Sequence, residues 1–278
     1  MDAHRSVLTL PTGVSISVII VDARASAVNN DVFFHFDLSF VGNRDFVHQV
    51  KNSFSSNCFN VKLGDVSYHT LLVADEARKL IDDLPYAKKV AVMLGALCHD
   101  FGKPPTTRFF DGKWRSHGHD EAGVEPTLSF LDKLGIFTLD GYDVRGQVVQ
   151  LVRYHLKPGE FYRAQPGDGA FRRLARKVEP DLLYRVAKAD SLGRNPEWLP
   201  KEKWFKAEAQ EWFIEKVRGL AVEKEAPKPI LMGRHLIELG LKPSPRFREI
   251  LDAVYEMQLD GKITSAEEAV EEAKRLIG

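Results

Sequence analysis

The spacing of apolar positions along the chain changes character near residue 60. Before that point, apolar and polar residues alternate over residues 14–20 and, more weakly, over residues 32–36. Alternation with a period of two is typical of half-buried strands. We therefore expect two or three strands in residues 1–60, with a turn at residues 29–31 and a small, polar linker at residues 53–57. The segment 1–60 shows no pattern that assigns it a role.

From residue 65 onward the apolar residues recur at helical spacing, which predicts a mainly α fold. A charged, proline-bearing stretch at residues 223–229 marks a boundary. The sequence thus divides into an N-terminal segment (1–60), a helical domain (61–222) and a C-terminal helical tail (229–278). The expected helices are 65–85, 86–101, 119–134, 143–155, 170–178, 180–192, 204–220, 232–239, 245–259 and 265–277.

Between two of these helices, residues 106–116 read as a short hairpin. Arg108, Phe109, Phe110 and Trp114 flank the Asp111–Gly112 pair, which is a strong turn signal. A hairpin here would serve as a lid or a contact surface, and its rings could stack on bases. Two further tryptophans, at positions 204 and 212, lie at helical spacing and are expected in the core.

Composition limits the classes of partner. Thirty-nine basic and 39 acidic side chains balance, so no global basic field indicates nucleic-acid binding, and any RNA contact must be local. Two cysteines, Cys58 and Cys98, are too few for a disulfide framework, and no apolar run is long enough to cross a membrane. We expect a soluble cytoplasmic protein; the sequence does not specify its oligomeric state.

The candidate chemistry is concentrated in imidazole and carboxylate side chains that stand at or near the ends of separate predicted helices. Helices packed as a bundle can project such groups inward to one point, where they would hold one or two divalent ions. This donor set suits Mn, Ni, Co, Fe or Zn, with Mg as a further candidate, and it needs no thiolate. The candidate metal ligands are His69, His99, Asp100, His119, His155 and Asp190.

Neighbouring residues are candidates for contacts with a phosphate. Lys103, one helical turn after His99, and Arg194, four residues after Asp190, are placed to bind phosphate oxygens. Asp100, Lys103 and His119 are the candidate catalytic residues, and His117 is a candidate substrate contact. Taken singly, each histidine is more often a hydrogen-bonded core residue than a ligand, and only the clustering favours the metal interpretation. Neither a glycine-rich phosphate loop nor a Gly-x-Ser-x-Gly nucleophile motif is present.

These motifs resemble the HD-domain metal-dependent phosphohydrolases, whose signature is a histidine, then His-Asp, then a distant aspartate. His69, the His99–Asp100 pair and Asp190 match this signature in order. Within that group, the chain resembles the C-terminal HD half of some bacterial tRNA nucleotidyltransferases, the CCA-adding enzymes. That similarity extends over residues 60–277 and includes the motifs at 65–70, 97–104, 117–123, 189–194, 232–243 and 258–261.

The resemblance implies an HD-type helical bundle, a divalent metal and hydrolysis of phosphate esters, with nucleotides, 2′,3′-cyclic phosphates or RNA ends as substrates and tRNA as a partner. Residues 1–60 lack the Gly-Gly and paired-aspartate motifs of the nucleotidyltransferase half, so we do not expect CCA addition by this chain alone. Two alternatives remain open. One is an RNA-binding or assembly module with a vestigial metal pocket, and the other is a nucleotide-sensing regulator with slow turnover.

Overall fold

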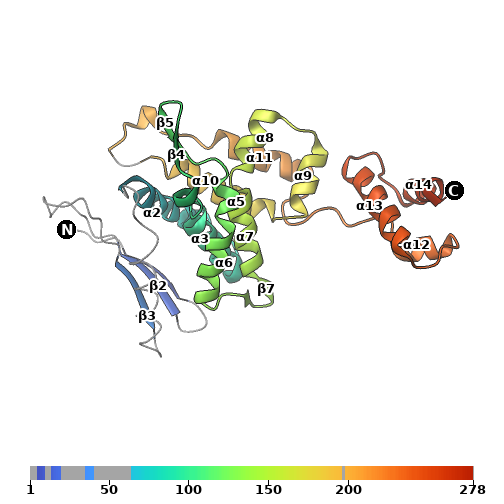
Figure 1. Ribbon diagram of the computed structural model, residues 1–278, viewed down its shortest axis with the longest axis horizontal. Coiled ribbons are helices and arrows are strands. Elements are labelled where there is room, and N and C mark those ends of the chain that lie inside the picture. Colours follow the sequence, from blue (N-terminus) through green and yellow to red (C-terminus); the bar gives the residue numbers. More distant parts are fainter. Residues whose placement is uncertain (1–4, 10–13, 20–34, 41–63, 196–197, 278) are drawn as a thin grey trace, which may run out of the picture.

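The protein is mainly α-helical, as the apolar spacing predicts, with a small sheet at its N-terminal end (Figure 1). The computed structural model describes residues 5–9, 14–19, 35–40, 64–195 and 198–277. Strands β1 (Arg5–Thr9), β2 (Val14–Ile19) and β3 (His35–Phe40) form an antiparallel sheet in the order β1-β2-β3. The expected turn at 29–31, the linker at 53–57 and Cys58 lie outside the described residues.

The helical part is built from a bundle followed by a separate C-terminal group of helices, and small hairpins connect some of the elements. The bundle comprises α2 (Gly64–Lys79), α3 (Tyr86–Cys98), α4 (Lys103–Thr106), α5 (His119–Ala122), α6 (Val124–Lys133), α7 (Val144–Tyr154), α8 (Lys157–Ala164), α9 (Asp168–Ala175), α10 (Pro180–Leu192), the 3-10 turn η2 (Lys201–Lys203) and α11 (Glu208–Gly219). The hairpins pair β4 (Arg108–Phe110) with β5 (Lys113–Arg115), and β6 (Thr138–Leu139) with β7 (Tyr142–Asp143).

Helix α3 is the centre of the bundle because it is apolar around most of its circumference. Val92 and Ala96 pack into a core shared with α2, α10 and α11, whereas Val90 and Leu94 pack into a second core shared with α6 and α7. A side chain at Gly95 would lie 3.1 Å from Leu151 on α7, so these two helices are in close contact. A helix buried on both sides is hydrophobic all round, and its burial fixes the position of its C-terminal end.

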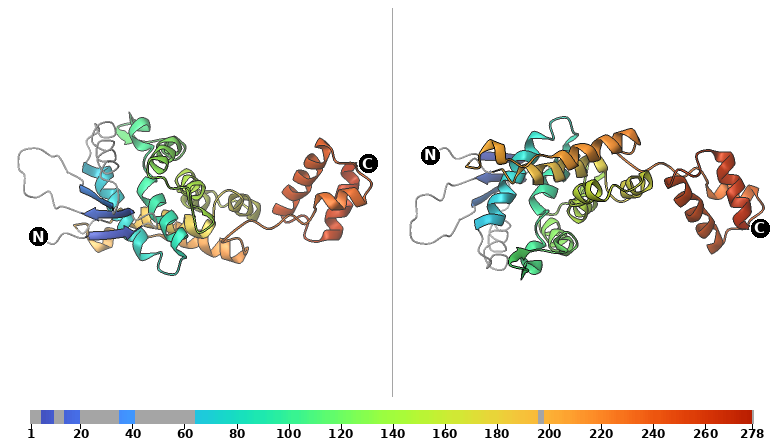
Figure 2. Two further views of the ribbon diagram at one scale, coloured as in Figure 1. Left: turned by 90° about the horizontal axis from the view of Figure 1, so that it is seen from below. Right: turned by 90° about the horizontal axis from the view of Figure 1, so that it is seen from above.

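The last helices form a separate group with their own core, at the opposite end of the molecule from the N-terminal sheet (Figure 2). This tail contains α12 (Gly233–Glu238), α13 (Pro245–Leu259) and α14 (Ala266–Ile277). Its contact with the bundle is polar: Arg173 on α9 pairs with Glu256 and with Asp260, each at 2.6 Å.

Several sequence expectations about helix ends are wrong in detail. The first helix ends at Lys79 rather than at Pro85, and the expected helix 119–134 is two helices that meet at Gly123. The short helix α8 was not expected; its proline occupies the first turn, where a missing N–H costs nothing. Trp212 packs against the core as expected, but Trp204 is 41% exposed.

Candidate metal centre

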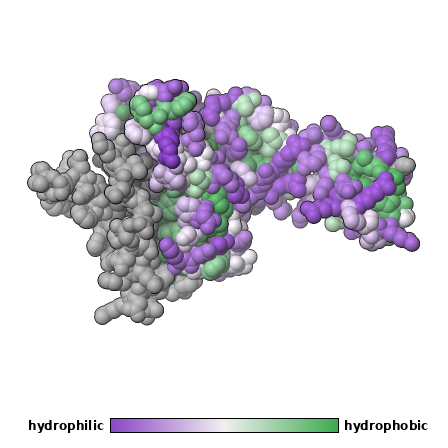
Figure 3. All heavy atoms as spheres, in the orientation of Figure 1, coloured by the Kyte–Doolittle hydropathy of each residue, from purple (hydrophilic) through white to green (hydrophobic). Residues whose placement is uncertain are grey.

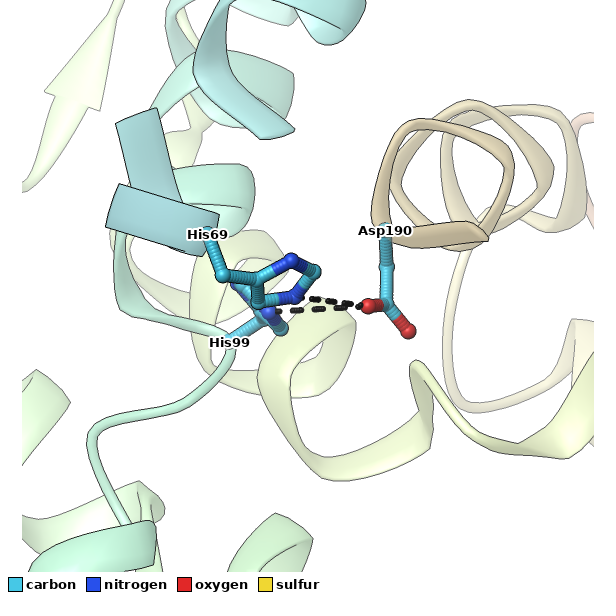
Figure 4. Close-up of side chains that lie close together, drawn as sticks. All are labelled: His69, His99 and Asp190. Atoms are coloured by element: carbon cyan, nitrogen blue, oxygen red, sulfur yellow. Dashed lines mark hydrogen bonds and ion pairs between the residues drawn. The ribbon is translucent and has the colours of Figure 1, made fainter. Parts of the chain in front are cut away.

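The six residues that the sequence suggests as metal ligands lie together, although they span 122 positions of the chain. His69 lies on α2, Asp190 lies on α10, and His99 directly follows α3; these three side chains face one another (Figure 4). Their nearest donor atoms all lie within 4.8 Å of one another. Asp100, His119 and His155 form a second trio that meets the same limit.

Each of the four imidazoles is oriented by a backbone carbonyl. Nδ1 of His99 donates to the carbonyl of Ala96 at 2.7 Å, and Nδ1 of His155 donates to that of Val152 at 2.6 Å. Both histidines are the C-caps of their helices, where the last carbonyls lack a partner within the helix. A histidine in this position therefore satisfies the helix end and directs its Nε2 atom away from it.

The other two imidazoles have the same orientation. Nδ1 of His119 donates to the Ser116 carbonyl at 2.7 Å, and Nδ1 of His69 donates to the Gly193 carbonyl at 3.2 Å. A carbonyl can only accept, so each Nδ1 carries a proton. Nε2 presents a lone pair when the ring is neutral, and it can donate, as Nε2 of His69 can to Asp190 Oδ1 at 3.1 Å, when the ring carries a second proton. Histidines that bind metals commonly have this second hydrogen bond to a carbonyl or carboxylate.

The Nε2 atoms point toward one another, and this arrangement favours a cation among them. Nε2 of His119 and Nε2 of His155 are 3.2 Å apart. Burial lowers the pKa of His155 to about 4, and the charge of His99 contributes to the same shift, so His155 is neutral near pH 7 and its Nε2 can only accept. Within the described part of the chain, His99 Nε2 is buried without a hydrogen bond, although Asp100 Oδ2 lies 3.2 Å away. Buried polar atoms without partners are rare in proteins unless they serve a ligand.

Two ionised carboxylates supply the negative charge. Burial opposes ionisation of Asp100, but neighbouring His99 and Lys103 hold its pKa well below the usual value. For Asp190, burial is likewise outweighed, chiefly by the hydrogen bond from His69, and its pKa is also lowered. These carboxylates in turn raise the pKa of His99 against the effect of its burial.

Asp100 is the residue that links the two trios. Its Oδ2 lies 3.2 Å from His99 Nε2 and 3.8 Å from His69 Nε2, while its Oδ1 lies 3.5 Å from His119 Nε2. The two oxygens of this carboxylate therefore face different trios, which is the geometry that a residue shared between two ions would need.

The predicted phosphate contacts lie at the edge of this cluster, with one exception. Lys103 Nζ is 2.6 Å from Asp100 Oδ2, and Nη2 of Arg194 is 3.2 Å from Asp190 Oδ2. Both cations are partly exposed, at 28% and 48% of the side chain, so each joins a buried carboxylate to solvent. His117 is exposed, and the structure does not bring it to the cluster by any hydrogen bond among the described residues.

The donor set fits a divalent ion that accepts nitrogen and oxygen ligands, such as Mn, Fe, Co, Ni or Zn, better than one that prefers oxygen alone. Cys98 precedes His99 but is not a candidate ligand. Its side chain is fully buried, and burial raises the pKa of its thiol, so the reactive thiolate is disfavoured.

Two glycines let the ligand-bearing segments approach closely; the sequence marks both as helix ends but does not predict this close packing. A Cβ at Gly102 would lie 1.9 Å from the carbonyl oxygen of His119, and a Cβ at Gly193 would lie 2.5 Å from Val73 Cγ2. Gly102 lies three residues after His99, and Gly193 lies three residues after Asp190. A glycine at this distance from a candidate ligand is the sequence signal that could have indicated the close approach.

Comparison with known proteins identifies the region that contains both trios. Residues 66–195 match the family model described as HD domain. The A-adding tRNA nucleotidyltransferase of Deinococcus radiodurans is 34% identical over 176 residues, which are 62% of this chain and 38% of that protein. The CC-adding tRNA nucleotidyltransferase of Thermus thermophilus is 31% identical over 63% of this chain and 38% of its own length.

A third relative, the multifunctional CCA protein of Actinobacillus pleuropneumoniae, is 28% identical over 65% of this chain and 45% of its own length. The matches therefore span less than half of these curated relatives. No solved structure matches the chain significantly. Among the described residues, no helix has both the length and the apolar character required to cross a membrane.

Proposed function

We propose that the protein is a metal-dependent phosphohydrolase, because residues 66–195 match the HD-domain family model and HD domains are a family of metal-dependent hydrolases. Its substrates are phosphomonoesters or phosphodiesters of nucleotides, 2′,3′-cyclic phosphates or RNA ends. The observation that carries the proposal is the pair of trios, His69–His99–Asp190 and Asp100–His119–His155, whose imidazoles all present Nε2 to a shared interior.

In this proposal both trios would hold divalent ions, and the carboxylate of Asp100 lies between the two trios. When bound, such ions supply an activated water and stabilise negative charge on phosphoryl oxygens. Asp100 is ionised and can accept the proton of an attacking water. Lys103 lies beside it, with its ammonium group 2.6 Å from Asp100 Oδ2 and 28% of its side chain exposed, so it can bind a phosphate oxygen and offset the charge that develops there.

Arg194 has the equivalent position beside Asp190. Its guanidinium group is half exposed and also lies 5.9 Å from the centre of the Phe205 ring. A guanidinium held by a carboxylate and by a ring keeps several donors free for a phosphate. Lys103 and Arg194 would therefore bind substrate from two sides of the cluster.

The relatives support a nucleic-acid context for this chemistry. Their names describe nucleotide addition to tRNA, and we propose tRNA or another RNA as the partner of this chain. The alternative is an RNA-binding or assembly module whose metal pocket is vestigial. All six candidate ligands are present and oriented inward, which favours the hydrolase.

The decisive experiment compares the wild type with Asp100→Ala. We expect purified wild type to bind Mn or Ni and to release phosphate from an aryl phosphate or a 2′,3′-cyclic nucleotide. Asp100→Ala removes the residue that links the trios, and the loss of a charge-stabilising group of this kind costs about 10²-fold or more in kcat.

The matched control is Asp132→Ala, which removes an exposed carboxylate paired with Arg145 on the surface. Circular dichroism should show that both variants are folded. Equal turnover in the wild type and Asp100→Ala, or a wild type that binds no divalent ion, would contradict the hydrolase and favour the vestigial pocket.

A further inference from the structure

The hairpin of β4 and β5 exposes an unusual amount of aromatic surface. Phe109, Phe110 and Trp114 are 62%, 59% and 72% exposed. Phe109 pairs directly with Trp114 across the two strands, and their ring centres are 5.4 Å apart in an edge-to-face arrangement. Cross-strand partners point to the same face of a hairpin, so these two rings form one aromatic face. Figure 3 shows an apolar patch over this hairpin with hydrophilic residues around it.

The same hairpin is positively charged. Residues 108–115 contain the cations Arg108, Lys113 and Arg115 and a single carboxylate, Asp111, which lies in the turn. All three cations are exposed, and across the described ranges no carboxylate lies within ion-pair distance of any of them. Some other basic residues of the bundle are paired with acids, for example Arg145 with Asp132 and Arg153 with Glu121. The unpaired cations of the hairpin are thus available to an anionic partner.

The base of the hairpin is attached to the candidate metal centre. The Thr107 and Ser116 hydroxyl groups are 2.8 Å apart, and Thr107 also donates its backbone N–H to the Lys103 carbonyl. On the other side, the Ser116 carbonyl accepts the hydrogen bond that orients His119. The aromatic pair stands two strand residues beyond this base, a span of about 7 Å. A polymer that lies on the rings can therefore extend a phosphate toward the cluster.

We infer that this hairpin is a binding platform for single-stranded nucleic acid, and that it presents a phosphate at or near the end of the strand to the metal centre. The bases stack on the face formed by Phe109 and Trp114, and the backbone contacts the long, exposed side chains of the unpaired cations, which flank these two rings along the strands. Aromatic rings interspersed with basic side chains are the features that bind single strands without reading their sequence. The inference rests on the proposed function and narrows its substrate class from any phosphate ester to strand ends.

Charge complementarity and ring geometry favour this partner over the others that an apolar patch can bind. A protein interface of this size would bury a more continuous apolar surface, with charged residues depleted at its centre. In the hairpin, basic residues stand at both ends of the strands, beside every ring. Anionic lipid would also attract these cations, so a membrane is included as an outcome of the test.

The test is fluorescence anisotropy of a labelled single-stranded oligoribonucleotide with a 3′-phosphate, using the full chain in EDTA so that no hydrolysis occurs. Phe109→Ala and Trp114→Ala should each weaken binding at least about fivefold, since one stacked base contributes about 1 kcal/mol or more. Phe137→Ala is the matched control because Phe137 is 54% exposed but lies at the opposite end of α7 from His155, about 16 Å along the helix.

The salt dependence separates the roles of rings and cations. Lys113→Ala and Arg115→Ala should each reduce the slope of log affinity against log salt by about 0.7, whereas Phe109→Ala should lower the affinity without changing the slope. Equal affinities in the wild type and the ring variants would overturn the inference. So would a wild type that binds phosphatidylserine vesicles through the hairpin and does not bind the oligonucleotide.

Failure of the proposed function would look different. A wild type that releases no phosphate from an aryl ester with added Mn or Ni contradicts the hydrolase, because this small substrate does not depend on nucleic-acid binding. The anisotropy assay needs neither metal nor turnover, so ring-dependent binding of the oligonucleotide would still support the platform in that case.

Discussion

The close approach at Gly102 gives a sharp test of how the two trios are held together. Gly102 joins the end of α3, which carries His99 and Asp100, to α4, and its φ of −83° is open to any residue. Alanine there would be unstrained in its own backbone, but its Cβ would lie 1.9 Å from the His119 carbonyl oxygen and 2.5 Å from the Gly123 nitrogen. Both neighbours are backbone atoms in α5 or at its end, so the contact is relieved only if the segments separate by roughly 1 Å.

That displacement would act directly on the site. The His119 ring lies 3.5 Å from Asp100 across this contact, so moving α5 away from α3 pulls apart the trio Asp100–His119–His155. A misplacement of about 1 Å can cost about 10²-fold in rate, and overpacking of this kind costs about 1–3 kcal/mol of stability. For Gly102→Ala we therefore expect a loss of phosphate release of about 10²-fold, weaker binding of the divalent ion and a Tm several degrees lower.

Calorimetric titration with Mn, phosphate release from an aryl ester and a thermal unfolding scan measure these three effects. Gly219→Ala, in the last turn of α11, is the matched control, because a Cβ there meets no atom within 4 Å and alanine is the better helix former. If Gly102→Ala retained the metal affinity, rate and Tm of the wild type, the close approach of α3 and α5 would not be what holds the second trio.

Two further predictions concern stability away from the site. Arg173→Ala removes two exposed ion pairs between α9 and the tail, worth about 0.2–1 kcal/mol each, so trypsin should cleave the connection at 223–229 several times faster than in the wild type. Adding about 0.5 M salt to the wild type should accelerate the cleavage in the same way, because salt screens these pairs. An unchanged cleavage rate would show that the tail is held by other contacts. Burial raises the pKa of Tyr142, as does the hydrogen bond that its hydroxyl group donates to Glu179 at 2.6 Å, so the stability that Tyr142 contributes is present below about pH 10 and is lost at higher pH. The unfolding free energy of the wild type should therefore fall more steeply than that of Tyr142→Phe between pH 9 and 11. Parallel curves for the two proteins would refute this assignment.

The sequence predicts the helices best where a local signal marks both ends. Helices α10 and α13 each begin at a proline and end beside a glycine or an Asp-Gly pair, and their expected bounds agree with the structure. The break between α5 and α6 lies at Gly123, where the backbone of Gly102 packs so closely that a Cβ on Gly102 would lie 2.5 Å from the Gly123 nitrogen. Contacts between segments distant in sequence leave no local pattern, so such breaks are hard to predict.

The candidate site likewise combines features that local sequence patterns predict with features that depend on contacts between distant segments. The clustering of imidazoles and carboxylates is visible in the sequence, and so is the Asp-Gly turn, whose residues both adopt positive φ in the hairpin. The carbonyls that orient His99 and His155 are also local, because each lies three residues back in the last turn of a helix. The carbonyl that orients His69 belongs to Gly193, 124 positions away, and only the packing of α2 against α10 places it there.

The charge balance of the cluster links the metal ions to the choice of substrate. Without an ion, Lys103 neutralises Asp100 and Arg194 neutralises Asp190. Cations added beside these two neutralised carboxylates make the site more positive, and a bound phosphate with two negative charges would offset that excess. A carboxylate that binds a metal ion also attracts its basic neighbour less strongly, so Lys103 or Arg194 is then free to contact the phosphate. Ion binding should therefore increase the affinity for a phosphate ester, and by linkage the ester should increase the affinity for the ion by the same factor.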